Sequence, residues 1–94
     1  MVNVKPTIPI AEVWRRIVAH EGEVFHQVKG QEFTYEVDGR VLRPSTVKQN
    51  LSQATFERAL ARVPLSSTVD VQDLRGPSYL YAILMDNRIR EGDW

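Results

Sequence analysis

The chain has 94 residues, 43% of them apolar and 26% charged, proportions typical of one globular domain rather than a disordered chain. Its 12 basic and 12 acidic residues balance, and it has no cysteine, which excludes disulfides, thiolate nucleophiles and cysteine-bound metals. A cysteine-free domain fits a reducing compartment. The N-terminus lacks the apolar core of a signal peptide, and no apolar run approaches the roughly 20 residues that span a bilayer. We therefore expect a cytoplasmic protein that does not enter a membrane.

Proline and apolar spacing define the first part of the chain. Residues 1–8 are expected to form an arm, since Pro6 and Pro9 oppose regular structure there. A helix should begin near Pro9, where proline fits the first turn, and Gly22 should end it. The apolar stripe that predicts its buried side recurs at helical spacing and consists of Ile10, Val13, Trp14, Ile17 and Val18.

Alternation of apolar and polar residues predicts three short strands at residues 24–28, 33–37 and 40–43. In the first of them His26 alternates with two valines, which would direct its side chain toward the core. The expected product is a three-stranded antiparallel β-meander with one side facing the core.

An Asp-Gly dipeptide at residues 38–39 favours a tight turn between the second and third of these strands. A two-residue turn at that place would pair Val37 with Arg40 and Tyr35 with Leu42. Cross-strand neighbours share a face of the sheet. The core-facing side chains would then be Phe33, Tyr35, Val37 and Leu42.

The second helix has a well-marked start. The polar stretch 45–50 should be a loop, and Ser52 is a good N-cap residue. Leu51 and Phe56 occupy the two positions of a hydrophobic staple around that cap. Pro64 should terminate the helix. Its buried stripe would consist of Phe56, Ala59, Leu60 and Val63.

Residues 65–76 fit either a short strand or a loop. A third helix should enter at Pro77, in its first turn, and run to about Arg88. Its core face would consist of Leu80, Ile83 and Leu84.

The remaining residues complete one domain. Residues 90–94 should form a tail that frays unless Trp94 packs back onto the body. Residues 9–89 are expected to fold as a single α+β domain. Its order would be an N-terminal helix, a three-stranded antiparallel meander, then two helices packed on one face of the sheet.

No catalytic or metal-binding signature is present. His20 and His26 lie close in sequence, but Gly22 should break the helix between them, so they do not match the H-E-x-x-H zinc motif. Ser78 follows Gly76-Pro77, which is not the G-x-S-x-G elbow of hydrolases. We therefore expect no metal, no cofactor and no catalytic residue, and an enzyme ranks third among the functions considered.

Basic residues are concentrated in one segment. Between Arg40 and Arg62 there are five basic residues and one acidic residue, while the rest of the chain is correspondingly acidic. A polar loop before a helix N-terminus can hold a phosphate, and cations on that helix can add contacts. The favoured hypothesis is a non-enzymatic binding domain for nucleic acid, through Arg40, Arg43, Lys48, Asn50, Ser52, Arg58 and Arg62.

A protein-interaction module is the alternative. Tyr79 and Tyr81 stand two residues apart on the third predicted helix, so both cannot face the core on one stripe. An exposed tyrosine on this C-terminal helix would suit a protein interface. The zero net charge also weighs against a dedicated nucleic-acid module, and no RNP, KH, zinc-finger or homeodomain pattern is present.

Overall fold

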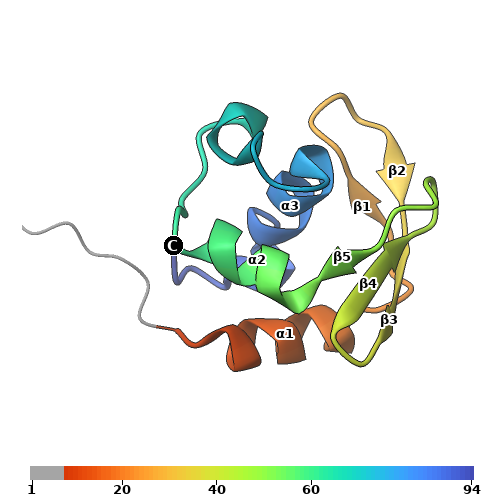
Figure 1. The fold of residues 1–94 in the computed structure, drawn as a ribbon, viewed down its shortest axis with the longest axis horizontal. Coiled ribbons are helices and arrows are strands. Elements are labelled where there is room, and N and C mark those ends of the chain that lie inside the picture. The colour runs from red at the N-terminus through yellow and green to blue at the C-terminus, as the bar shows by residue number, and fades with distance from the viewer. Residues whose placement is uncertain (1–7) are drawn as a thin grey trace, which may run out of the picture.

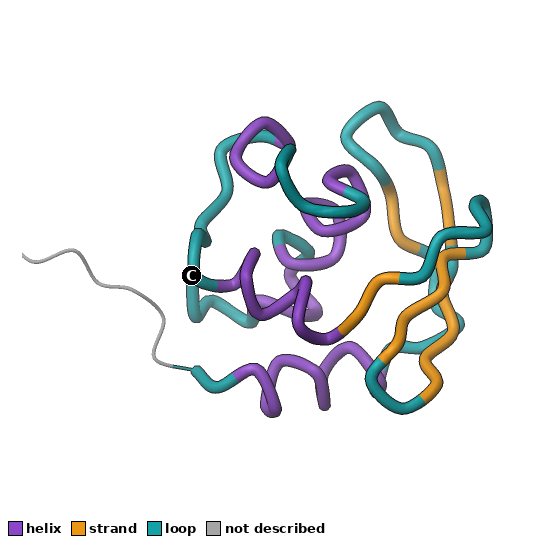
Figure 2. Tube along the Cα trace, in the orientation of Figure 1, coloured by secondary structure: helices purple, strands orange, loops and turns teal. Residues whose placement is uncertain are grey.

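The computed structural model describes residues 8–94. It confirms a small α+β domain with an N-terminal helix, a three-stranded antiparallel sheet and later helices. Figure 1 shows the strands gathered on one side of the domain and the helices beside them, and Figure 2 shows the same division by element type. The elements are α1 (Ile10–Ala19), β1 (Phe25–His26), β2 (Glu32–Phe33), β3 (Tyr35–Asp38), β4 (Val41–Pro44), β5 (Leu51–Ser52), α2 (Gln53–Leu60), the 3-10 helix η1 (Thr68–Val71), α3 (Pro77–Leu84) and α4 (Asn87–Arg90).

The expected arm at residues 1–8 falls, apart from its last residue, outside the described residues. Within the described part of the chain, no helix is long and apolar enough to cross a bilayer.

The three-stranded sheet has a different membership from the predicted meander. Its order is β3-β4-β5, while β1 pairs only with β2 in a separate two-stranded sheet. The break falls at Thr34, whose amide donates to the hydroxyl of Ser45 and whose carbonyl accepts from the Ser45 amide. The third strand is the short β5, which leads directly into α2. The strand expected at residues 24–28 is therefore wrong as a member of this sheet.

The hairpin between β3 and β4 is shifted by two residues from the predicted register. Val37 lies opposite Leu42 and Tyr35 opposite Pro44, so the pairs expected from a turn at residues 38–39 do not form. The turn is centred one residue later, with Gly39 at φ 61° in its first central position, as a type II′ turn requires. Because side chains alternate with a period of two, this shift leaves each predicted face unchanged.

The predicted orientation of His26 is wrong. His26 is exposed, with its Nε2 3.2 Å from a carboxylate oxygen of Glu32. Phe25 is fully buried in its place, with ring centroids 6.0 Å from Phe33 and 5.3 Å from Tyr35. An aromatic ring removes far more apolar surface from water than an imidazole flanked by valines. The strand therefore takes the alternation phase that buries Phe25.

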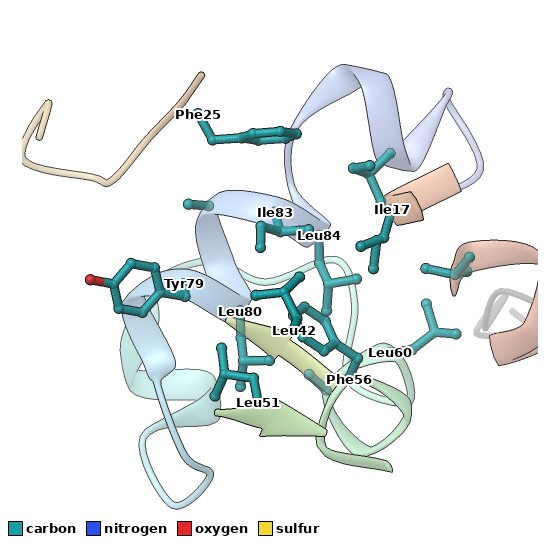
Figure 3. Close-up of a cluster of buried hydrophobic side chains, with 14 of the residues drawn as sticks. Ile17, Phe25, Leu42, Leu51, Phe56, Leu60, Tyr79, Leu80, Ile83 and Leu84 are labelled. Atoms are coloured by element: carbon teal, nitrogen blue, oxygen red, sulfur yellow. The ribbon is translucent and has the colours of Figure 1, made fainter. Parts of the chain in front are cut away.

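The core contains every residue expected to form its centre. Figure 3 shows Leu42, Phe56, Leu80 and Leu84 crowded together, with side chains from β4, α2 and α3. The predicted core residues, all buried, are Trp14, Ile17, Phe33, Tyr35, Leu42, Phe56, Leu60, Leu80 and Leu84. One residue of the predicted α1 stripe is misplaced: Val18 is 43% exposed.

Two helix ends carry the caps that the chain needs. Ser52 caps α2 as expected, because its hydroxyl accepts from the Thr55 amide at 3.2 Å. The third helix, however, ends at Leu84 rather than near Arg88, because the Asp86 carboxylate accepts from the Arg88 amide and starts α4.

The structure also settles two segments whose conformation the sequence left open, residues 65–76 and the tail at residues 90–94. Residues 65–76 contain the single-turn helix η1 rather than a strand. The tail packs back, since the indole Nε1 of Trp94 donates to the carbonyl of Leu84 at 2.7 Å.

Candidate nucleic-acid interface

Helix α2 turns one side to the core and the other to solvent. Phe56, Ala59 and Leu60 are buried, whereas Arg58 is exposed on the helix. The helix ends at Leu60, earlier than the expected stop at Pro64, so Arg62 is exposed in the turn that follows α2 and not on the helix itself. Ser52 caps the first turn of the helix, and Leu51 and Phe56 on either side of the cap are fully buried in the core, so the start of α2 is held in place. The same packing that holds α2 therefore presents Arg58, on the helix, and Arg62, in the turn after it, to solvent.

Arg62 joins α2 to the segment at residues 72–76. Its two terminal nitrogens donate to the two carboxylate oxygens of Asp73, at 2.5 and 2.9 Å, and Nη1 also donates to the carbonyl of Asp70 at 3.1 Å. These hydrogen bonds hold the pKa of the Asp73 carboxyl below its usual range, with a smaller contribution from the charge of Arg58. Arg58 thus lies close enough to the pair to influence it.

The close approach of the Gly76 backbone to the side chains of Leu51 and Gln49 fixes the position of its neighbour Arg75. The next residue, Gly76, has φ 66° and lies against β5: a Cβ there would stand 2.7 Å from Leu51 Cδ2 and 3.5 Å from Gln49 Oε1. The segment that carries Arg75 therefore runs beside the loop that carries Lys48. Arg75 is exposed.

Arg75 is not among the site residues predicted from the sequence. It is 13 positions beyond Arg62 along the chain, and no local pattern indicates the Gly76 contact. A glycine directly before the proline that opens a helix was the available signal, because such a residue often permits close backbone approach.

Four basic side chains and one carboxylate make up what we call the α2 face. They are Lys48, Arg58, Arg62, Asp73 and Arg75. Within residues 8–94, Lys48, Arg58 and Arg75 form no ion pair, and Asn50 is exposed beside Lys48 in the same loop. In Figure 1 this loop lies beyond the β5 end of α2.

The remaining predicted site residues lie on the β3–β4 hairpin and at the start of α2. Arg40 is exposed at the hairpin turn, where its carbonyl accepts from the Gln53 amide at 2.8 Å. Together with the Ser52 cap, this contact occupies two amides of the first turn of α2, so the helix N-terminus offers little to a phosphate. Arg43 lies across the hairpin from Glu36 and 3.6 Å from Asp38, in a region of mixed charge.

The tyrosines of the protein-interaction alternative are less accessible than that hypothesis needs. Tyr79 is buried, and its hydroxyl lies 2.6 Å from that of Thr46, which ties α3 to the loop between β4 and β5. Tyr81 is half-buried and packs against the core. Tyr79 therefore serves packing and holds the loop that carries Lys48.

A groove elsewhere on the surface carries exposed apolar side chains. Its volume is about 400 Å³, and Val28 at its edge is 64% exposed. Val69, the residue after Thr68 in its lining, is 68% exposed. The groove is lined by Gln27, Val28, Lys29, Gln31, Thr68 and Ser78.

The basic residues around α1 and α4 are engaged in structure. Arg16 is buried on α1 and donates to the carbonyl of Ile89 at 3.0 Å. It also pairs with Glu12, at 3.0 Å, and Asp93, at 2.8 Å. Because these partners come from both ends of the domain, Arg16 fixes α4 and the tail against α1.

Arg88 has a comparable structural role. Its guanidinium pairs with Asp86 and Glu23 and donates to the carbonyl of Val24 at 2.8 Å. The guanidinium carbon lies 3.8 Å from the ring centre of Phe25, within cation–π range. These contacts hold the β1 segment against α4.

The two histidines each contact one carboxylate, His20 with Glu23 at 3.0 Å and His26 with Glu32 at 3.2 Å. Residues 8–94 contain no group of three or more potential metal ligands. Comparisons of the chain with known protein families, curated proteins and solved structures found no match.

Proposed function

We propose that this chain is a non-enzymatic binding domain whose α2 face binds the phosphate backbone of duplex nucleic acid. One observation supports the proposal: Lys48, Arg58 and Arg75 come from three separate segments, are exposed, and form no ion pair within the described residues. Arginine and lysine contact phosphates without reading sequence. The freedom from cysteine is compatible with a cytoplasmic place for such a domain.

The expected binding is weak and electrostatic. Each neutralised phosphate contributes about −0.9 to the log–log dependence of affinity on salt. Three to four contacts on the α2 face would give a slope of roughly −3 to −4. Arg40 would add a contact where the duplex extends past the N-terminal end of α2.

Fluorescence anisotropy with a labelled duplex of about 20 base pairs tests the proposal, at roughly 50 and 200 mM salt. We expect micromolar binding at the lower salt concentration and a large loss of affinity at the higher one. Absence of binding at the lower salt, where even non-specific binders are visible, would refute it.

Protein binding is the second candidate, favoured by the exposed Val28 in the lining of the groove and by the exposed Val69, which follows the lining residue Thr68. Exposed apolar groups beside a concavity are typical of interaction sites. This candidate predicts that the apolar dye ANS binds the native domain. Replacing both valines by serine should abolish the dye signal, and an unchanged signal would exclude the groove.

A further inference from the structure

We propose that Asp73 is a built-in competitor for the phosphate-binding side of Arg62. The proposal rests on the function proposed above, because it concerns the same face. While Asp73 holds Arg62, the α2 face binds nucleic acid through its other three cations, and Arg62 contacts a phosphate only when Asp73 no longer occupies it.

The geometry of the pair carries the argument. A guanidinium presents parallel donors that match a carboxylate or a phosphate equally, two oxygens against two nitrogens. Asp73 occupies that arrangement with both of its oxygens. A phosphate that bound Arg62 in the same two-pronged way, through both terminal nitrogens, would compete for these donors.

The pair is also accessible and displaceable. The side chain of Arg62 is 38% exposed and that of Asp73 is 63% exposed, so a duplex can reach both. Exposed ion pairs are weak because water and salt screen them. The carbonyl of Asp70 holds Arg62 independently through Nη1, so the arginine keeps its position when Asp73 leaves.

A matched pair of variants isolates this effect. Asp73→Asn removes the competing charge with little change of shape. Asp70→Asn removes the same charge three residues earlier, but the Asp70 carboxylate contacts Ser66 and not Arg62. Thermal melts of both variants would check the fold, and Asp73→Ala provides a second version of the test variant.

Anisotropy titrations with the labelled duplex decide the matter. Asp73→Asn should bind roughly threefold to tenfold more tightly at about 50 mM salt, with a salt slope steeper by about 0.9, as one added phosphate contact requires. Asp70→Asn should leave the slope unchanged. In an Arg62→Ala background, Asp73→Asn should no longer steepen it.

Two negative results have different meanings. If the unmodified protein binds and Asp73→Asn has the same slope as Asp70→Asn, the competitor proposal is overturned and the proposed function stands. If neither the unmodified protein nor Asp73→Asn binds the duplex, the proposed function fails, and the competitor proposal fails with it.

Discussion

Arginines occur both around α1 and α4 and on the α2 face, but they differ in how many contacts they make within the protein. Arg16 and Arg88 each contact carboxylates and a backbone carbonyl from distant parts of the chain. Arg58 and Arg75 are exposed and form no such contact within residues 8–94. The net charge of the whole chain is zero, so it does not separate the two regions. What separates them is whether the basic side chains pair with groups of the protein, which stabilises the fold, or are left exposed for a ligand.

The largest effect should come from the buried side of α2. Leu60→Ala should lower the free energy of unfolding by about 2–5 kcal/mol, the usual cost of deleting a buried leucine side chain. Arg58→Ala, on the exposed side of the same helix, should change it by less than about 0.5 kcal/mol. Urea denaturation measures both. Similar costs for the two variants would contradict the assignment of the helix faces.

Arg16 should show how much an engaged arginine contributes. Arg16→Ala should cost about 3 kcal/mol, the lower end for breaking a buried pair, because its acidic partners are partly in water. Arg15→Ala is the control, since Arg15 pairs with the same Glu12 at 2.6 Å but is exposed. It should cost less than about 1 kcal/mol. Equal losses in urea denaturation would remove the distinction between the two regions.

Gly76 should be needed to hold the segment of Arg75 against β5. Gly76→Ala places a methyl group 2.7 Å from Leu51 Cδ2 in a backbone conformation that suits glycine. The cost should be about 1–3 kcal/mol. Gly39→Ala also has positive φ but nothing within 4 Å, so it isolates backbone strain from the clash. Thermal melts in which Gly39→Ala is the more harmful variant would contradict the contact.

The α1 charges predict a pH dependence at acid pH. Hydrogen bonds from Arg15 and then Arg16 lower the pKa of Glu12 from 4.5 to about 2. A carboxyl group whose pKa is lower in the folded than in the unfolded state stabilises the fold at pH values above its unfolded pKa. For Glu12 this contribution to stability is lost as the pH falls from about 4.5 toward 2. Glu12→Gln should therefore lose less thermal stability over that range than the unmodified protein. Parallel curves of Tm against pH would exclude this role for Glu12.

The parts of the fold that follow from local patterns could be predicted from the sequence. The faces of α1, α2 and β3 rest on spacing, and the Ser52 cap rests on a residue type. The orientation of the strand around His26 was ambiguous, because apolar residues occur on both of its sides: Val24 and Val28 on the side of His26, and Phe25 on the other. The large Phe25 ring decides which side is buried. The hairpin register shifted without changing any face.

Features that depend on distant contacts could not be predicted. Arg16 is buried because its partners include the carbonyl of Ile89, 73 residues away. Arg75 joins the α2 face through the Gly76–Leu51 contact, and Arg62 is paired through Asp73. The sequence shows the excess of cations between Arg40 and Arg62, but folding decides which of them are left unpaired.

One comparison of double variants tests the central claim most directly. Arg58→Ala with Arg75→Ala removes two cations from the α2 face, and Arg15→Ala with Lys29→Ala removes two exposed cations elsewhere. In anisotropy titrations with a labelled duplex, the first pair should flatten the log–log salt slope by about 1.8, while the second should leave the slope unchanged. Equal changes in slope for the two double variants would contradict a nucleic-acid interface on α2.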